Sequence, residues 1–353
     1  MISAIRSIWI LTSCCFHQID GFAHIPISHS PAIPDSSELA ELASFANTLA
    51  DAARLEILPY WRSPRNNLGQ EIKHESNRSE FQSASPVTLA DRAAERAMRE
   101  LIEERYPNHG IYGEEYGVVR SDADFVWVID PIDGSRSFIT GKPLFGTLVS
   151  CLYKGKPVIG IIDQCVLDER WVGIAGQQTT LNGVSICTDG VSTLKDAEMY
   201  STSPDMFRDE DWTKFTAMKN AVRTLHYGAD CYAYALVATG HADVVVEADL
   251  GLYDYCSLVP VLEGAGGVIS DWEGRELTLQ NHENSKGRVV ACASKDLLEE
   301  SLQILQQKTR EHLNSVKSVK MIQFRLYQNN QTQLLYCSVS WLEKLLLISV
   351  YNS

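Results

Sequence analysis

"VWVIDPIDGSRSF", residues 126–138, places two carboxylates three positions apart, Asp130 and Asp133, directly after a run of apolar residues. A short apolar run bounded by turn residues is typical of a buried strand. We therefore predict a strand over 125–129 whose end carries both acids. Two uncompensated carboxylates at this point would repel each other, so the stretch predicts a positive charge between them.

The residues around the two acids indicate what carries that charge. Carboxylate oxygens are ligands that Mg²⁺ prefers, and substrate phosphate usually completes its coordination. Pro131 makes the turn rigid and has no N–H donor, which leaves the carbonyl of Ile132 available as a third oxygen ligand. Gly134 and Ser135 begin the next segment, and if that segment is helical its first amides point toward an anion.

Two carboxylates are too few for a site that holds a pair of metal ions. Glu114 and Glu115 lie a short distance upstream, and only one of them can face the metals because adjacent side chains in extended chain point in opposite directions. We expect Glu115 to be the structural one. Asp254 precedes another predicted helix, and Asp91 lies on the second predicted helix.

The apolar periodicity predicts a layered α/β fold. Helical patterns cover 35–61 and 86–107, and a polar stretch between them, 62–85, predicts a mobile loop. Strands are predicted over 125–129, 146–153, 157–163 and 170–175, and strands and helices alternate from 197 onward. On the second helix we expect Ala94, Ala97, Met98, Leu101 and Ile102 to face inward. The sum is a mixed sandwich of sheets and helices in one domain, 35–307.

The two ends of the chain do not match this fold. Residues 1–34 contain the apolar stretch "IWILTSCCF", too short to span a bilayer, followed by hydroxyl residues with no acid until Asp35. "GFAHIP" is similar to cleavage junctions of plastid presequences, so we expect a targeting presequence for a plastid, with a secretory signal as the alternative. We assign no role to residues 308–353, and we expect no stable membrane insertion.

Composition excludes several classes of function. The formal net charge is −14, with no basic run, which is unsuited to nucleic-acid binding. The nine cysteines form no Cys-x-x-Cys pair and lie mostly singly among apolar residues, which predicts buried free thiols in a reducing compartment. An acidic protein that acts on a phosphate needs bound cations.

Three separated segments together resemble one family. "GEE" (113–115), "WVIDPIDGSRSF" (127–138) and "YDYCSLVPVLEGAGG" (253–267) are similar to the inositol-monophosphatase-like family of Mg²⁺-dependent, lithium-sensitive phosphatases. The resemblance covers residues 36–305. It implies an αβαβα sandwich of the inositol monophosphatase and fructose-1,6-bisphosphatase type and a homodimer. It also implies two or three Mg²⁺ ions per subunit and inhibition by Li⁺.

The resemblance also implies metal ligands, position by position. Glu114, Asp130 and the carbonyl of Ile132 match the first metal site of the family. Asp130, Asp133 and Asp254 match the second. This set would hold the metals on either side of the phosphoryl group.

Catalytic roles follow from the same comparison. Gly134 and Ser135 match the phosphate-binding turn, where Ser135 replaces the usual Thr of the family. Ser135 and Glu114 would orient and deprotonate a water activated by the metals, and Asp91 would hold the Ser135 hydroxyl. The water would attack the phosphorus in line.

Within the family the chain resembles plant-type histidinol-phosphatases. The inositol branch tends to have Thr-Asn where Arg136 and Ser137 stand. L-Histidinol phosphate is therefore the expected substrate, with Asp230 attracting its ammonium group. Glu247 matches a substrate-hydroxyl contact of the inositol branch. The alternatives are inositol monophosphatase, then nucleotide-bisphosphate phosphatase, and in another class a non-catalytic phosphate-binding or regulatory protein.

Each candidate acid also has a purely structural interpretation. Asp130 and Asp133 would then be solvated turn acids, and Glu247 an ordinary surface acid. Asp91 and Asp230 would complement the dipole at the start of a helix. The polar loop 70–84 is longer than its family counterpart, which affects any third metal site.

Overall fold

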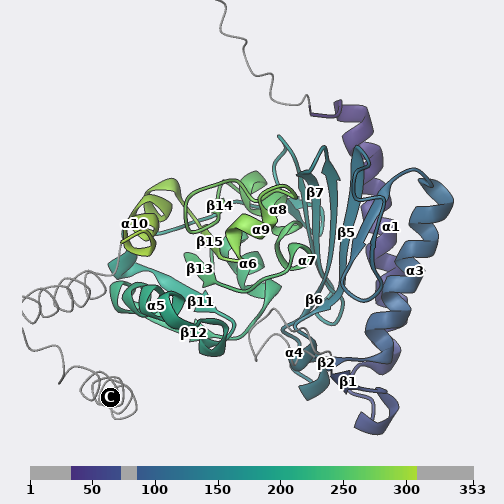
Figure 1. The fold of residues 1–353 in the computed structure, drawn as a ribbon, viewed down its shortest axis with the longest axis horizontal. Coiled ribbons are helices and arrows are strands. Elements are labelled where there is room, and N and C mark those ends of the chain that lie inside the picture. The colour runs from purple at the N-terminus through teal and green to yellow at the C-terminus, as the bar shows by residue number, and fades with distance from the viewer. Residues whose placement is uncertain (1–32, 73–85, 308–353) are drawn as a thin grey trace, which may run out of the picture. The chain divides into compact units, whose positions relative to one another are not determined.

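A computed structural model describes residues 33–72 and 86–307 and shows helices and strands in alternating layers (Figure 1). Helices α1 (Ser36–Ile57) and α3 (Leu89–Arg105) cover one face of an eight-stranded sheet. Helices α6 (Cys231–Ala238), α7 (Leu252–Tyr255) and α8 (Leu258–Gly264) lie between that sheet and a five-stranded sheet. This succession of layers confirms the predicted αβαβα sandwich.

The eight-stranded sheet is antiparallel except for one parallel pair, β3 with β5. Its strands, in spatial order, are β10 (Val184–Ser185), β9 (Thr180–Leu181), β8 (Glu169–Ile174), β7 (Lys156–Gln164), β6 (Gly146–Tyr153), β5 (Phe125–Asp133), β3 (Gly110–Gly113) and β4 (Gly117–Val119). The predicted bounds of β6 are confirmed, and those of β7 and β8 agree to within one residue at each end.

The five-stranded sheet is mixed, with β11 parallel to both of its neighbours and β15 antiparallel to both of its own. Its order is β12 (Thr224–Tyr227), β11 (Glu198–Ser201), β13 (Val244–Glu247), β15 (Val289–Cys292) and β14 (Val268–Ser270). The outer helices are α5 (Asp209–Ala221) and α10 (Lys295–Leu305). The remaining elements are α4 (Ser135–Thr140), α9 (His282–Ser285), the β1 (Glu71–Ile72) and β2 (Pro86–Val87) pair, and the 3₁₀ helices 58–60, 65–67, 194–196 and 204–206.

The first helix forms as its sequence predicts. Asp35 accepts hydrogen bonds of 2.9 Å from the amides of Ser37 and Glu38, so α1 begins with a side-chain cap. The apolar residues that recur at the helical period along α1 are all buried against the sheet: Leu39, Leu42, Ala43, Ala46, Leu49, Ala50, Ala53 and Ile57. Burial of this stripe fixes α1 on the eight-stranded sheet.

The inward face of α3 differs from the prediction. Ala97 and Leu101 are only half-buried, whereas the acids Asp91 and Glu95 are fully buried. An apolar pattern assigns acids to the solvent side. Here they face inward because the fold supplies hydrogen-bond donors for them.

The strand that carries Asp130 does not end at Ile129, as predicted. β5 continues to Asp133, and its register with β6 shifts between Asp130 and Asp133. Such an irregularity bends a strand and redirects its side chains. The two carboxylates therefore belong to one distorted strand end.

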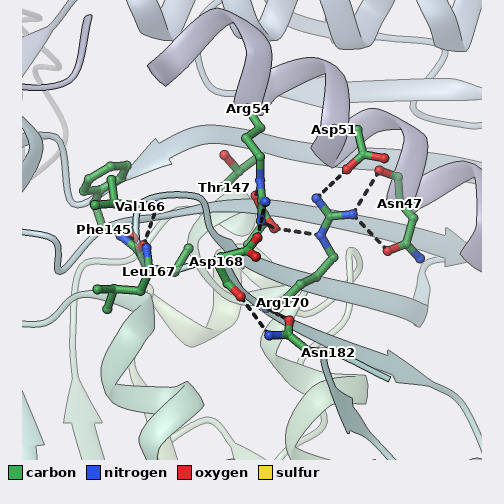
Figure 2. Close-up of polar contacts among 12 residues, drawn as sticks. Asn47, Asp51, Arg54, Phe145, Thr147, Val166, Leu167, Asp168, Arg170 and Asn182 are labelled. Atoms are coloured by element: carbon green, nitrogen blue, oxygen red, sulfur yellow. Dashed lines mark hydrogen bonds and ion pairs between the residues drawn. The ribbon is translucent and has the colours of Figure 1, made fainter. Parts of the chain in front are cut away.

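A polar cluster joins α1 to the outer face of the sheet (Figure 2). The buried carboxylate of Asp163 on β7 accepts from Arg54 of α1 and from Arg170 of β8, each at 2.7 Å. Arg170 also reaches Asp51 at 2.7 Å, and Arg54 reaches Asp168 at 2.5 Å. The carboxylate lies between two guanidinium groups, and Asp163 raises the pKa of Arg54.

Some predictions fall outside the described residues, namely the presequence, most of the 70–84 loop and the segment 308–353. Among the described cysteines the prediction of burial is wrong for Cys187, which is exposed, and right for the other five, Cys151, Cys165, Cys231, Cys256 and Cys292. None of the helices within 33–72 and 86–307 has the length and apolar character needed to cross a bilayer.

Candidate active site

All predicted site residues except Asp91 line one pocket. The predicted residues around it are Glu114, Asp130, Ile132, Asp133, Gly134, Ser135, Asp230, Glu247 and Asp254. Glu115 does not line it, so the expectation that one of the two adjacent glutamates faces the site is confirmed for Glu114. Asp91 lies behind Ser135, fully buried.

Three carboxylates form the centre of the pocket. Asp130 and Asp133 come from the distorted end of β5 and Asp254 from α7, and each offers an oxygen within 4.8 Å of the others. Glu114 lines the same pocket beside Asp130 but lies outside this group of three. Hard oxygen donors at this spacing fit a Mg²⁺ ion.

The charges in the pocket also fit a bound cation. Burial, and then repulsion by Glu114, Asp133 and Asp254, raises the pKa of Asp130 well above its ordinary value. The pKa of Asp133 is raised by burial and by the nearby Asp230 and Asp254 carboxylates. A divalent cation among these groups would remove the repulsion and favour their ionised forms.

Hydrogen bonds within the turn hold the candidate ligand atoms in place. The amide of Ile132 donates to Asp130 Oδ1 at 3.1 Å, and Thr147 Oγ1 donates to the carbonyl of Pro131 at 2.8 Å. Ser135 Oγ donates to the carbonyl of Ile132 at 3.0 Å. This carbonyl oxygen has a second lone pair, so the contact leaves it able to bind a metal ion.

Asp91 contacts both its own helix and the pocket. Its Oδ2 accepts from the amide and hydroxyl of Thr88, at 2.8 and 2.6 Å, which closes a capping box at the start of α3. Its Oδ1 lies 3.5 Å from Ser135 Oγ. The structural and the functional interpretation of Asp91 are therefore compatible.

The turn that was predicted to bind phosphate depends on a glycine more than on a helix dipole. Gly134 has φ +89°, and a Cβ there would lie 3.0 Å from the Leu144 carbonyl and from Asp230 Oδ2. Only glycine fits both constraints without strain. Since α4 has only six residues, the dipole predicted to help anion binding is weaker than in a long helix.

Two further acids, Asp230 and Glu247, line the pocket. Asp230 directly precedes α6, and burial together with the Glu247 carboxylate raises its pKa to about 7, which the Arg136 guanidinium opposes. Glu247 is buried and accepts from the Thr202 amide at 2.8 Å and from the Tyr234 hydroxyl at 2.9 Å. The interpretation of Glu247 as a surface acid is wrong.

No role in the site was predicted for three residues that line the pocket, Arg136, Cys231 and Tyr234. Arg136 served only to mark the branch of the family, yet it is half-buried, lines the pocket and lowers the pKa of Asp230. Cys231 and Tyr234 line the pocket from α6, and the Cys231 amide donates to Asp133 Oδ2 at 2.5 Å. For Tyr234 the sequence contained a signal, because a residue four positions after Asp230 shares its face of a helix, whereas Cys231 and Arg136 had no such signal.

Comparison with known proteins gives a consistent result. A model of the inositol monophosphatase family matches residues 38–310. The chain is 42% identical over 284 residues to "Bifunctional phosphatase IMPL2, chloroplastic" of Arabidopsis thaliana, covering 79% of each protein. It is 31% identical to a histidinol-phosphatase of Chlorobaculum parvum, covering 59% of this chain and 83% of that one.

A solved structure of an inositol monophosphatase from Zymomonas mobilis has a TM-score of 0.66 and 39% sequence identity. The match covers 78% of this chain and all of that one. The family model alone accounts for more than half of the chain, and the predicted resemblance is confirmed. The chain belongs to the inositol monophosphatase family.

Proposed function

We propose that this protein is a Mg²⁺-dependent phosphatase that hydrolyses L-histidinol phosphate to L-histidinol and phosphate. Membership of the family supports phosphate monoester hydrolysis. The observation that carries the proposal is the group of Asp130, Asp133 and Asp254 oxygens within 4.8 Å, in the pocket that also contains Glu114 and Ser135.

Each acid has a part in the proposed mechanism. Bound Mg²⁺ would neutralise the phosphoryl oxygens and the leaving alkoxide and lower the pKa of a water ligand. Asp130, Asp133, Asp254, Glu114 and the Ile132 carbonyl would hold the metal ions.

The turn after β5 would orient the reacting groups. Ser135 and Glu114 would take up the proton of the attacking water, while Asp91 holds the Ser135 hydroxyl in place. The backbone of Gly134 and Ser135 would bind the phosphoryl group for in-line attack.

The charged side chains that line the pocket support the choice of substrate. Histidinol phosphate carries an ammonium group, whereas inositol phosphate carries only hydroxyls. Asp230 and Glu247 contribute two carboxylates to the pocket lining against one guanidinium, that of Arg136, so the lining favours a cationic leaving group. The histidinol-phosphatase name of the Chlorobaculum relative supports the same choice.

Inositol monophosphate is the second candidate, supported by the similarity to the Zymomonas enzyme. A non-catalytic role is the alternative of another class. A relative in Pseudomonas aeruginosa, 32% identical over 59% of this chain and 79% of its own, is named Nus factor SuhB. Intact acids throughout the pocket favour catalysis over binding alone.

We further propose the organisation of the whole chain. Residues 1–34 would be a plastid presequence, which the chloroplastic relatives of Arabidopsis thaliana support. Residues 35–307 would be the phosphatase domain, 308–353 an extension without an assigned role, and the active form a homodimer.

Phosphate release from a panel of monoesters tests the function. The full chain would be assayed with histidinol phosphate, inositol 1-phosphate and adenosine 3′,5′-bisphosphate, each with Mg²⁺, with EDTA, and with Mg²⁺ plus Li⁺. We expect the highest kcat/KM for histidinol phosphate, no turnover in EDTA and inhibition by Li⁺. A higher kcat/KM for inositol 1-phosphate would overturn the proposed substrate. A failure to release phosphate from any of the esters would overturn the proposal that the protein is a phosphatase.

A further inference from the structure

Helix α3 presents two fully buried carboxylates toward the active site, Asp91 and Glu95, four residues apart. Side chains at this spacing lie on the same face of a helix. Asp91 approaches Ser135, as described above. Glu95 instead approaches the turn that connects β3 with β4, and that turn begins with Glu114.

The carboxylate of Glu95 accepts the two amides that follow Glu114. Its Oε2 lies 2.6 Å from the Glu115 amide, and its Oε1 lies 3.0 Å from the Tyr116 amide. The Glu114 amide itself donates to the Ile129 carbonyl of β5 at 3.3 Å. The backbone of Glu114 is therefore fixed on one side by the sheet and on the other by Glu95.

The residues around Glu95 provide donors and space for its carboxylate. Arg99, one turn later on α3, donates from Nε to Oε1 at 2.7 Å and also contacts the Gly117 carbonyl. A Cβ at Gly113 would lie 2.0 Å from Glu95 Oε1, so the strand leaves space for the carboxylate by having no side chain there. Burying a carboxylate is unfavourable unless donors compensate it, and here three donors do.

We propose that Glu95 is a positioning residue that holds the Glu114 carboxylate in the geometry needed to bind the metal ion and accept a proton. This inference rests on the proposed function of Glu114. With Asp91 behind Ser135, α3 supports both members of the proposed water-activating pair. Glu95 itself does not line the pocket, so its effect passes through the turn.

Glu95→Gln tests the proposal with little change in shape. The amide group presents an N–H donor where the carboxylate presents an acceptor, so one backbone amide of the turn faces another donor. We expect the half-saturating Mg²⁺ concentration to rise about tenfold or more, the usual scale for losing a group that orients a metal ligand. The KM for the phosphate ester should change little.

Binding of Mn²⁺ to the substrate-free protein, measured by calorimetry, gives a readout that does not depend on activity. Glu95→Gln should weaken Mn²⁺ binding about tenfold. Combining it with Glu114→Gln should weaken binding no further than Glu114→Gln alone, because both act through the same carboxylate. Arg99→Gln leaves the Glu95 carboxylate intact and should weaken Mn²⁺ binding by a smaller factor. This variant replaces Glu95→Gln in the test if Glu95→Gln does not fold.

Asp243 offers a matched control. It is also a buried carboxylate that accepts two backbone amides, from Val191 at 3.1 Å and from Glu198 at 2.7 Å, but it does not line the pocket. Asp243→Asn should lower the melting temperature without changing Mn²⁺ affinity. Equal losses of affinity in Asp243→Asn and Glu95→Gln, or wild-type affinity in Glu95→Gln, would overturn the proposal. A wild-type chain that binds Mn²⁺ but releases no phosphate would contradict the proposed function alone, since the Mn²⁺ comparison would still decide the role of Glu95.

Discussion

The amide of Cys231 donates a hydrogen bond of 2.5 Å to the Oδ2 atom of Asp133, although the two residues are 98 positions apart in the chain. This bond favours the ionised form of Asp133 and lowers its pKa, against the larger effect of burial. It also connects the first turn of α6, which begins after Asp230, with the end of β5 that carries the proposed metal ligands. The residues proposed to bind the substrate and those proposed to bind the metal ions are thus parts of one connected structure.

Asp130→Asn and Asp254→Asn should each abolish Mg²⁺-dependent turnover, with a loss of roughly two powers of ten or more in kcat. Each change removes ligand charge while keeping side-chain volume, so the fold should persist. Initial rates at saturating Mg²⁺, together with circular dichroism of each variant, check this prediction. Near-normal rates in either variant would contradict the proposed metal site.

Ser135→Ala should lower kcat by roughly two powers of ten, the scale for losing a positioned proton-transfer group. Ser135→Thr keeps the hydroxyl that contacts the Ile132 carbonyl and approaches Asp91, so it should retain most of the activity. Single-turnover rates of both variants separate chemistry from product release. If Ser135→Ala turned over at the wild-type rate, Glu114 and the metals would have to act without this hydroxyl.

Asp230→Asn should raise the KM for histidinol phosphate roughly tenfold, the scale of one charge-assisted hydrogen bond, with little effect on inositol 1-phosphate. The reason is that only the first substrate carries an ammonium group for the carboxylate to attract. The measurement is kcat/KM for both substrates with both proteins. An equal loss on the two esters would assign Asp230 a structural role.

The metal-free protein should lose stability as the pH rises from about 4 toward 7. Folding raises the pKa of Asp130, Asp133 and Glu247 and raises that of Asp230 to about 7, so these four groups bind more protons in the folded state than in the unfolded chain over this range. Their contribution is most favourable below the unfolded pKa values and is lost as the pH rises through the folded ones. Bound Mg²⁺ should offset the repulsion, so the increase in melting temperature on adding Mg²⁺ should be larger at pH 8 than at pH 5. The same increase at both values would contradict the assignment of these acids to one cation site.

Asp163→Asn should lower the free energy of unfolding by about 3 kcal/mol, because it removes the buried partner of two guanidinium groups. Asp168→Asn is the matched control, since the Asp168 side chain is 85% exposed and also pairs with Arg54. That variant should change stability little, as exposed ion pairs usually contribute little. Urea unfolding of both variants checks the comparison. Equal losses in the free energy of unfolding would mean that the burial of Asp163 does not determine how much these ion pairs stabilise the fold.

The local parts of the fold and site were predictable from the sequence. The stripe on α1 and the bounds of β6 follow from apolar periodicity alone, because every residue involved lies within one element. Asp130 and Asp133 were identifiable as candidate metal ligands because their spacing and the adjacent proline and glycine are local features of the sequence.

The remaining parts depend on contacts between distant segments. Glu95 was unpredictable as a buried acid because its partners, the amides of Glu115 and Tyr116, belong to another element. The continuation of β5 past Pro131 depends on pairing of Asp133 with Gly146 of β6. Similarly, the raised pKa of Asp230 arises from burial and from Glu247, which the fold brings close from a different strand.

The group of Asp130, Asp133 and Asp254 draws on a strand from the first half of the domain and a helix from the second. A ribosome must therefore synthesise the chain beyond α7 before the last of the three carboxylates leaves the exit tunnel. Until then a nascent chain has only part of the proposed ligand set and lacks the complete group of three carboxylates. Activity is consequently a property that begins late in synthesis, and C-terminal truncations before Asp254 should be inert even where the first sheet has already formed.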